Sequence, residues 1–331
     1  MTALANEDVP AGGQQHSQRL LATLLGDYWF WRTEHIPSAA LVELLGEFGL
    51  AEPAARAAIR RSAARGLVVA AKNGRTTSYG VPRMGHELIV RHLTRLMRFG
   101  AGDRVWDGRW TLVMFSLPEE HREDRRTLRT KLRWLGLAPL YDGVWVTPWD
   151  LGAQVLEVLA ELDVGAATVG RAELAPELPV GGHPLQAWDL SELRMLYDGF
   201  LERYEPLRER VLAGAVDPAE ALVTRTKIMT EWRQFPGADP ELPAAILPRD
   251  WPMPAARACF VQVYDGLGAP AERRFSELLG QHAPELAGFA AHRTSDDIRR
   301  GEPVTDERWR RQDRNGWAGP LGQGDPDNRW R

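Results

Sequence analysis

The Asn-Gly pair Asn73-Gly74 separates two β-prone runs, LVVAAK (67–72) and RTTSYGV (75–81), and constrains the fold of this chain more than any other feature. Asn-Gly between two such runs is the strongest short-range hairpin signal, because both turn residues need a positive φ. We therefore predict a β-hairpin over 67–81.

Three helical patterns precede this hairpin. Residues 15–30 carry leucines at helical spacing, and a second pattern follows Pro37 with its apolar residues along one face. The third pattern covers 51–66, with Pro53 near its start and Gly66 at its end. Three helices followed by a hairpin predict an N-terminal winged helix-turn-helix domain over 14–98.

The third helix carries arginines on one side. Arg56, Arg60 and Arg61 lie at i, i+4 and i+5, with Arg65 a further turn on, while Ala55, Ile59 and Ala63 can face the core. The N-terminal part of a recognition helix meets base edges and later residues meet phosphates. We expect Arg56 to contact bases, Arg60 to share that role, and Arg61 and Arg65 to contact phosphates. The alternative is a solvated arginine face, and the hairpin directly behind the helix favours DNA binding.

The charge of the chain is asymmetric. Residues 14–98 hold twelve Lys/Arg against six Asp/Glu, whereas 99–331 carry a net charge of −8. This pattern indicates a polyanion-binding module on an acidic body. The predicted DNA-binding residues are Arg56, Arg60, Arg61 and Arg65 on the helix and Lys72, Asn73, Arg75 and Thr76 at the hairpin tip.

The middle of the chain, 99–180, alternates strand and helix patterns. Strands are predicted over 109–117, 141–148 and 165–174, and helices over 118–135 and 151–162. This order predicts a central ferredoxin-like α+β domain. Glu119, Glu120, Glu123 and Asp124 could be proposed as a metal site, but acidic residues in the first turns of a helix with a basic end complement the helix dipole.

A C-terminal α-helical domain is predicted over 181–292, with helices over 190–212, 218–235 and 255–279. The tail, 293–331, has few aliphatic residues and is predicted to be disordered or folded only against another surface. Its tryptophans leave a docking role open. The expected fold class is thus a multidomain α+β protein.

Signals for catalysis, cofactors and membranes are missing from the sequence. It contains no phosphate-binding loop, dinucleotide fingerprint or G-x-S-x-G sequence, and its eight histidines form no H-x-x-x-H pair. The single cysteine, Cys259, lies in an apolar helix and is expected to be inert. No apolar run is long enough to cross a bilayer, and no leader opens the chain. We expect a cytoplasmic protein that is not an enzyme, with no catalytic residue, metal or cofactor and no membrane contact.

Several segments, in order, resemble the PaaX family of bacterial regulators, repressors named for the phenylacetic acid degradation operon. They are LLATLLGDYW (20–29), AEPAARAAIRRSAARGLV (51–68), WDGRWTLVMFSLPE (106–119), LRWLGLAPLYDGVWVTP (132–148) and LPRDWP (247–252). The resemblance implies a winged helix, a middle domain similar to the small CRISPR spacer-acquisition nuclease, and a helical C-terminal domain. It also implies a homodimer that a phenylacetyl-CoA-type thioester releases from DNA.

An acyl-CoA needs cations for its phosphates and an apolar slot for its acyl group. Arg225, Lys227, Trp232 and Arg233 offer these side-chain types, although the sequence does not show that they meet in space. They are the predicted ligand-binding residues.

The preferred hypothesis is a ligand-responsive, homodimeric repressor of an aromatic-acid (phenylacetate-type) catabolic operon, which binds double-stranded operator DNA and is released by an acyl-CoA effector. One alternative is a metal-dependent nuclease built on the central ferredoxin-like domain. That nuclease fold carries an aspartate where this first strand ends Phe115-Ser116-Leu117-Pro118, with no carboxylate until Glu119. The central domain is therefore expected to serve in dimerisation or in ligand binding. A second alternative is a scaffold whose basic domain binds an acidic protein.

Overall fold

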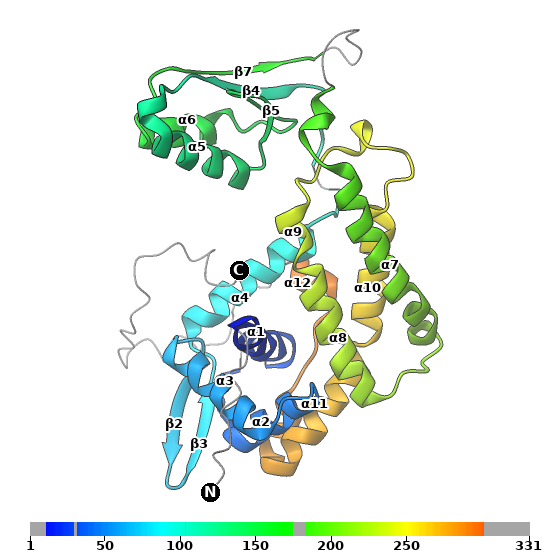
Figure 1. Cartoon of the computed structure of the whole chain (residues 1–331). Coiled ribbons are helices and arrows are strands. Elements are labelled where there is room, and N and C mark those ends of the chain that lie inside the picture. The colour runs from blue at the N-terminus through cyan, green and yellow to red at the C-terminus, as the bar shows by residue number, and fades with distance from the viewer. Residues whose placement is uncertain (1–10, 30–31, 103, 175–182, 301–331) are drawn as a thin grey trace, which may run out of the picture. The chain divides into compact units, whose positions relative to one another are not determined.

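The computed structural model describes residues 11–29, 32–102, 104–174 and 183–300. These residues form twelve α-helices and two small antiparallel sheets (Figure 1). The chain divides into two compact units, one of residues 1–98, 202–234 and 257–331 and one of residues 99–201 and 235–256. The predicted multidomain α+β class is confirmed at this level.

The N-terminal part of the first unit contains four helices and a three-stranded sheet. They are α1 (Ala11–Tyr28), α2 (Ser38–Gly46), α3 (Glu52–Ala64), α4 (Arg83–Arg98), β1 (Ile36–Pro37), β2 (Val69–Asn73) and β3 (Thr76–Gly80). The strands pair antiparallel in the order β1-β3-β2. As the leucine spacing predicts, α1 buries Leu20, Leu21, Leu24 and Leu25.

C-terminal helices complete the first unit. They are the second half of α7 (Leu190–Leu212), α8 (Pro218–Trp232), most of α10 (Met253–Gly266), α11 (Gly268–His282), the 3₁₀ helix η4 (Pro284–Phe289) and α12 (Ser295–Arg300). Helix α11 packs against α8 and α2, α1 packs against α8, and α12 packs against α4. The rings of Tyr28 and Phe275 stack with centroids 5.1 Å apart. The N-terminal helices and the C-terminal helices therefore share one core.

The helix predicted over 255–279 is two helices, α10 and α11, which meet at Leu267. Pro270 explains the break. In a helix interior a proline removes a backbone hydrogen bond and clashes with the preceding turn, whereas it is tolerated in a first turn. Starting α11 at Gly268 places Pro270 in that first turn.

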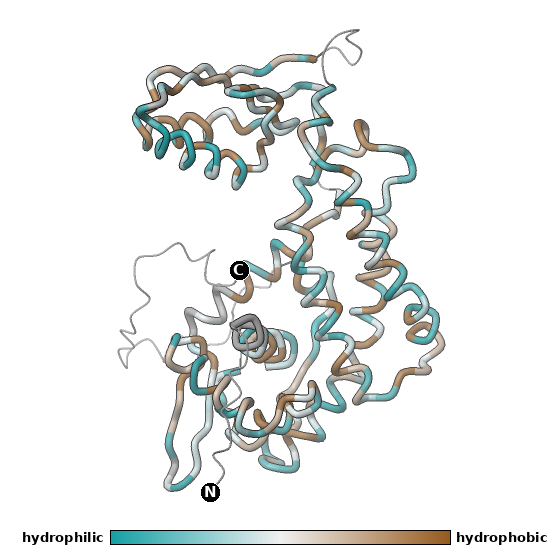
Figure 2. The backbone as a smooth tube through the Cα atoms, in the orientation of Figure 1, coloured by the Kyte–Doolittle hydropathy of each residue, from teal (hydrophilic) through white to brown (hydrophobic). Residues whose placement is uncertain are grey.

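The second unit contains a four-stranded antiparallel sheet in the order β5-β6-β4-β7, formed by β4 (Trp110–Phe115), β5 (Ala138–Tyr141), β6 (Val144–Thr147) and β7 (Ala167–Ala172). Helices α5 (Arg122–Trp134) and α6 (Gly152–Glu161) bury Leu128, Leu132, Val155 and Leu159 in one cluster with Val113, Phe115 and Trp145 of the sheet. Figure 2 shows hydrophobic positions of these helices toward the sheet and hydrophilic positions away from it. The remaining short elements are the 3₁₀ helices η1 (Glu119–His121), η2 (Pro184–Ala187) and η3 (Ala244–Ile246) and helix α9 (Phe235–Ala238).

The strand predicted over 141–148 covers β6 and only the last residue of β5, and it is part of a hairpin, β5–β6, that was not predicted. Its turn contains Gly143 at φ +82°, where a Cβ would lie 2.6 Å from the carbonyl oxygen of Phe115. Only glycine fits there. Pro139 argues against a strand in the sequence, because proline cannot donate a hydrogen bond to a neighbouring strand. It is tolerated here because β5 lies at the edge of the sheet.

The start of the predicted tail also differs from expectation. Residues 293–300 continue the folded unit: α12 packs on α4 and buries Ile298 and Ser295. The Ser295 amide and hydroxyl donate to the two carboxylate oxygens of Asp265 at 2.6 and 2.7 Å. This short helix has only one buried aliphatic residue, Ile298, so a search for long apolar patterns misses it. Residues 301–331, with the three tail tryptophans, lie outside the described residues.

The expected domain borders at 98, 180 and 292 stay predictions. The compact units follow contacts through space and are discontinuous along the chain, with one division after Leu201 inside α7. The region predicted as a single helical domain contributes residues to both units.

Candidate nucleic-acid interface

Helix α3 presents a small-residue face inward and an arginine face outward. Ala55, Ala58, Ile59 and Ser62 are buried, and α3 packs against α1 and α2. Small side chains let the backbones approach closely, so that a short helix can be held firmly. Ala55 and Ile59 face the core as predicted, whereas Ala63 is only half-buried.

Two of the predicted DNA-binding arginines of α3 lie fully on the outer face. Arg56 and Arg60 are exposed, and Arg65, the C-terminal cap, is exposed as well. Arg56 donates from Nε and Nη2 to Oε1 of Glu52, both at 2.8 Å. An exposed ion pair of this kind contributes about 0–1 kcal/mol to stability, so an anion that binds Arg56 more tightly can displace Glu52.

Arg61 differs from the other three. It is half-buried, and its Nε is buried with no hydrogen-bond partner among the described residues. Part of the Arg61 side chain therefore packs against the protein, and less of its surface is accessible to a ligand than that of Arg56 or Arg60.

Four residues, 65–68, separate α3 from the hairpin β2–β3. Asn73 pairs with Thr76, so the two turn residues are Gly74 and Arg75 rather than Asn73 and Gly74. Of these two only Gly74 has a positive φ, +59°. A glycine at the first central position is what a type II′ turn needs. The hairpin itself is confirmed, but its turn is one residue further along than predicted.

This shift places Arg75 at the hairpin tip. Lys72, Arg75 and Thr76 are all exposed; the side chain of Asn73 lies outside the described residues. The tip therefore presents two cations to solvent.

Ion pairs join α2, on which α3 packs, to α11. Arg274 donates from Nε and Nη2 to the two carboxylate oxygens of Glu47, at 3.0 and 2.8 Å. Nε2 of His282 lies 2.5 Å from Oε2 of Glu43. A bidentate pair adds geometric specificity to its energy, so α2, and α3 packed on it, have a defined position in the first unit.

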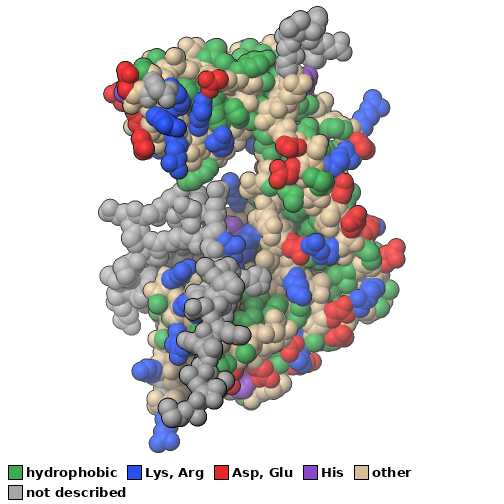
Figure 3. All heavy atoms as spheres, in the orientation of Figure 1, with side chains coloured by type: hydrophobic (Ala, Val, Ile, Leu, Met, Phe, Trp, Pro, Cys, Tyr) green, Lys and Arg blue, Asp and Glu red, His purple; other side chains and the backbone are tan. Residues whose placement is uncertain are grey.

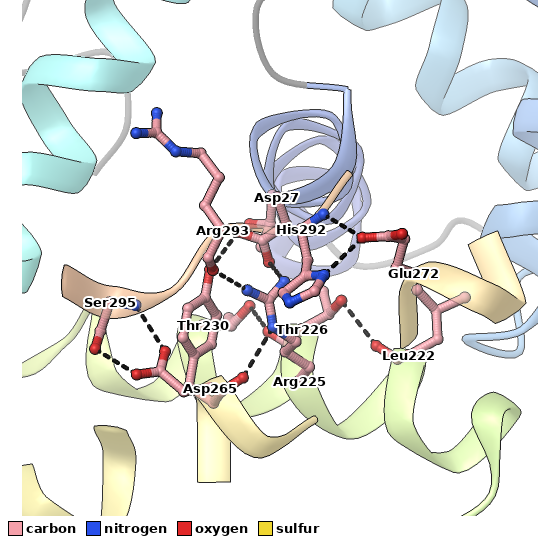
Figure 4. A network of polar contacts seen from close by, with 12 residues as sticks. Asp27, Leu222, Arg225, Thr226, Thr230, Asp265, Glu272, His292, Arg293 and Ser295 are labelled. Atoms are coloured by element: carbon pink, nitrogen blue, oxygen red, sulfur yellow. Dashed lines mark hydrogen bonds and ion pairs between the residues drawn. The ribbon is translucent and has the colours of Figure 1, made fainter. Parts of the chain in front are cut away.

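Arg225, the first predicted ligand-binding residue, is fully buried in a polar network (Figure 4). Its Nε donates to the carbonyl of Tyr264 at 3.0 Å and its Nη2 to the carbonyl of Arg293 at 2.7 Å. Its Nη1 lies 3.8 Å from Oδ2 of buried Asp27, and its Cζ lies 3.8 Å from the centroid of the Tyr264 ring. Arg225 thus joins α1, α8, α10 and the residues before α12.

Asp27 completes this network from the side of α1. The Tyr264 hydroxyl donates to its Oδ1 at 2.9 Å. Burial raises the pKa of Asp27, while Arg225 and the Tyr264 hydroxyl oppose that rise. A buried charge is tolerated only when it is paired and hydrogen-bonded, so Asp27 and Arg225 depend on one another.

The other predicted ligand-binding residues do not meet Arg225 in one pocket. Trp232 is buried and stacks on Phe260 with centroids 4.6 Å apart, while Lys227 is exposed. Arg233 lines a small hollow between α1, α4 and α8 together with Thr23 and His92. Its Nη1 donates to Oγ1 of Thr23 at 3.2 Å.

This hollow is short of hydrogen-bond partners. Nε of Arg233 and Nε2 of His92 are both buried without a partner among the described residues. Burial, reinforced by Arg233 and Arg95, lowers the pKa of His92 to about 4. The imidazole is therefore neutral at pH 7, and the hollow carries the positive charge of Arg233.

Three family models match this chain in sequence order. The model described as PaaX-like protein matches residues 16–82, the PaaX protein central Cas2-like domain matches 103–180, and the PaaX-like protein C-terminal domain matches 188–277. The chain belongs to the PaaX family. Among curated proteins, it is 27% identical over 283 residues to the transcriptional repressor PaaX of Escherichia coli (strain K12), which covers 82% of this chain and 85% of that relative. A solved structure of the uncharacterized protein Rv0674 from Mycobacterium tuberculosis is 24% identical, with 78% of this chain and 96% of that chain covered and a TM-score of 0.48.

The name of this PaaX relative is that of a repressor, in agreement with the prediction that the chain is not an enzyme. Among the described residues, no group of three or more His, Cys, Asp or Glu is placed to hold a metal ion. Burial raises the pKa of the Cys259 thiol to about 12, with Glu205 adding to the rise, so it stays protonated. No helix in the described ranges is both long and apolar enough to span a bilayer.

Sequence reasoning missed the partners of Arg225 in this PaaX family member. Asp27 stands inside the apolar run LLATLLGDYW, whereas Tyr264 and Arg293 lie in the C-terminal third of the chain. The position of Asp27 gives a signal: a carboxylate one turn after the buried Thr23 and Leu24 has to be buried too, and so needs a cation. The identity of that cation could not be inferred, because Asp27 and Arg225 are far apart in the sequence.

Proposed function

We propose that this chain is a DNA-binding transcriptional repressor of a phenylacetic acid catabolic operon. The observation that carries the proposal is the exposed arginine face of α3 followed directly by a hairpin with cations at its tip. Its family membership and the name of its relative, transcriptional repressor PaaX, agree with it.

The N-terminal part of the first unit is proposed to be a winged helix-turn-helix. The order α1, α2, α3, β2, β3, with β1 pairing to β3, supports this assignment. In such a domain α3 enters the major groove and the hairpin, or wing, lies over the adjacent backbone.

The contacts with double-stranded operator DNA divide by position along α3. Arg56 and Arg60, nearer the N-terminus of the helix and exposed, read base edges; an arginine that contacts guanine O6 and N7 together is the commonest specific contact. Arg61, Arg65, Lys72 and Arg75 contact phosphates, and Asn73 and Thr76 are polar neighbours at the tip.

The sheet of the second unit is proposed to be ferredoxin-like. Its connectivity, strand–helix–strand–strand–helix–strand, and its order β5-β6-β4-β7 support this proposal. We assign it a role in homodimer formation. A two-fold dimer binds half-sites one helical turn or a multiple apart. The nuclease alternative is not favoured, since β4 ends at Phe115 and Ser116-Leu117-Pro118 follows without a carboxylate.

An acyl-CoA such as phenylacetyl-CoA is the proposed effector. Among the four residues predicted to bind it, Arg225 and Trp232 have structural partners in the core, whereas Arg233 is a cation beside a hollow. We therefore keep Arg233 as the residue through which an anionic group of the effector acts. To release DNA, the effector must bind the free state more tightly than the DNA-bound state.

The test is binding of the full chain to the regions upstream of its own gene and of the neighbouring operon, measured by fluorescence anisotropy against a shuffled duplex of equal length. We expect specific binding 10³-fold or more tighter than non-specific binding, as is typical of such regulators. Titration of phenylacetyl-CoA should then lower the operator affinity, whereas free coenzyme A should not. Equal affinity for every duplex would contradict the proposal.

A further inference from the structure

Helix α5 carries a second row of arginines. Arg122, Arg126, Arg129 and Arg133 lie at i, i+4, i+7 and i+11, so they share one face of the helix. Arg122, Arg126 and Arg133 are exposed and Arg129 is half-buried. Figure 3 shows Lys and Arg side chains gathered over α5. We call these four residues the α5 arginine face.

Counter-charges neutralise only part of the α5 arginine face. Arg129 donates to Oδ1 of Asp142 at 2.5 Å, and the guanidinium of Arg133 lies over the Trp145 ring, 5.3 Å from its centroid. Arg122 and Arg126 make no ion pair that the described part of the chain shows. At least two guanidinium groups on this face are therefore available to a ligand.

The α5 arginine face costs helix stability. Arg122 and Arg126 are like charges at i, i+4 spacing, as are Arg129 and Arg133, and such pairs destabilise a helix. A helix face that is merely exposed to solvent typically carries positive and negative side chains in alternation at this spacing. The charge is also out of place, because residues 99–331 carry a net charge of −8 while 122–133 hold six cations against two carboxylates. A polyanionic ligand accounts for both observations.

The shape of the surface selects the class of polyanion. The α5 arginine face lies on the exposed side of a helix and spans about 16 Å along the axis. A small phosphate ester is bound in a concave site. An extended row of cations on a convex surface matches the backbone of duplex DNA, which carries one negative charge about every 1.7 Å of helix axis.

We propose that the α5 arginine face binds the phosphate backbone of DNA, as a second cationic contact in addition to α3 and the β2–β3 hairpin. The proposal rests on the proposed function, since it assumes that DNA is the partner. Its contribution is independent of base sequence, because it meets phosphates alone. Arg122 and Arg126 supply most of it.

The test compares the full chain with the variant Arg122→Gln/Arg126→Gln. A matched control, Arg249→Gln/Arg273→Gln, removes two exposed arginines outside α3, the hairpin and α5 and so changes the net charge equally. Binding constants are measured for the operator and for a shuffled duplex at salt concentrations from about 50 to about 300 mM. In this range the number of phosphate contacts determines how steeply the affinity falls with salt. Circular dichroism and the melting temperature check that each variant is folded.

We expect the α5 variant to flatten the slope of log K against log salt by about two units on both duplexes, and to weaken both by a similar factor of at least about tenfold at 0.1 M salt. The ratio of operator to shuffled affinity should not change. The control should keep the wild-type slope. A folded α5 variant with the wild-type slope on both duplexes would overturn the proposal, as would an equal loss in the control.

Two further outcomes separate this proposal from the proposed function. If the wild type shows no operator preference but the α5 variant still loses affinity for the shuffled duplex, the α5 arginine face is supported and the repressor function fails. If the α5 variant binds both duplexes like the wild type but loses binding to phosphatidylserine-containing vesicles, the face binds a membrane surface and the DNA proposal is overturned.

Discussion

Helices α3 and α8 both carry arginines that the sequence nominates as binding residues, yet the structure gives them opposite surroundings. On α3, Arg56 and Arg60 are exposed beside alanines that form the buried face. On α8, Arg225 is fully buried between Leu222, Ile228 and Met229. The residue type alone therefore does not identify a site, and the helical face on which an arginine lies does.

This difference was available from the sequence of α8. Leu222, Arg225, Met229 and Trp232 follow one another at i, i+3, i+7 and i+10, so Arg225 falls on the apolar stripe of its helix. An arginine in that position has to find buried partners, because an unpaired buried charge is far too costly. Lys227, two residues on, falls on the opposite face and is exposed.

The largest expected effect tests the buried arginine. Arg225→Met should lower the free energy of unfolding by about 3–5 kcal/mol, because it leaves the Asp27 carboxylate buried without its cation. The matched control Lys227→Met, on the same helix but exposed, should change it by less than about 0.5 kcal/mol. Urea unfolding followed by circular dichroism measures both.

The double variant Asp27→Asn/Arg225→Met sharpens this test. If the two residues act as a pair, it should be more stable than Arg225→Met alone, since no charge is then left buried. Equal stability of Arg225→Met and Lys227→Met would show that Arg225 does not hold the core together.

A second prediction concerns the environment of Arg233. Because the pKa of His92 falls from its ordinary 6.5 to about 4 on folding, the unfolded chain takes up a proton between these values and the folded chain does not. Stability is therefore lost as the pH falls through this window, by about 2 kcal/mol between pH 7 and pH 5. In His92→Gln this part of the pH dependence should vanish, which urea unfolding at the two pH values will reveal. A variant with the same loss as the wild type would mean that His92 does not titrate as its burial implies.

A smaller effect is expected at the hairpin tip. Arg75→Ala removes one exposed cation from the turn and should weaken operator and shuffled DNA alike, with the salt slope flatter by about one unit. Folding should be unaffected, because Gly74, not Arg75, supplies the positive φ of the turn. Anisotropy titrations across a salt series measure this, and selective loss of operator binding would assign Arg75 to base contacts instead.

Local patterns predicted the N-terminal elements well. The leucine spacing of α1, the Pro53 start of α3 and the glycine of the hairpin turn are each determined by residues close together in the sequence, so they can be recognised from the sequence alone. The misplaced turn shows the limit: strand pairing of Asn73 with Thr76 decides which two residues turn, and that register depends on the whole hairpin.

Features that depend on distant partners could not be predicted in the same way. Edge strand β5 forms only because β6 lies beside it, and α12 is helical against α4. The network of Asp27, Arg225 and Tyr264 joins three segments that are far apart in the sequence. The arginines of α5 were visible, but their interpretation as a complement to the helix dipole left aside the single face on which four of them lie.

The most direct test of the central claim, that the exposed arginines of α3 read DNA, is the ratio of operator to shuffled-duplex affinity for the wild type and Arg56→Ala at one salt concentration. The account predicts that this ratio falls roughly five- to 150-fold, which corresponds to about 1–3 kcal/mol of discrimination. The melting temperature should stay unchanged, because Arg56 is exposed and its loss leaves the core intact. A folded Arg56→Ala protein that keeps the wild-type ratio would contradict it.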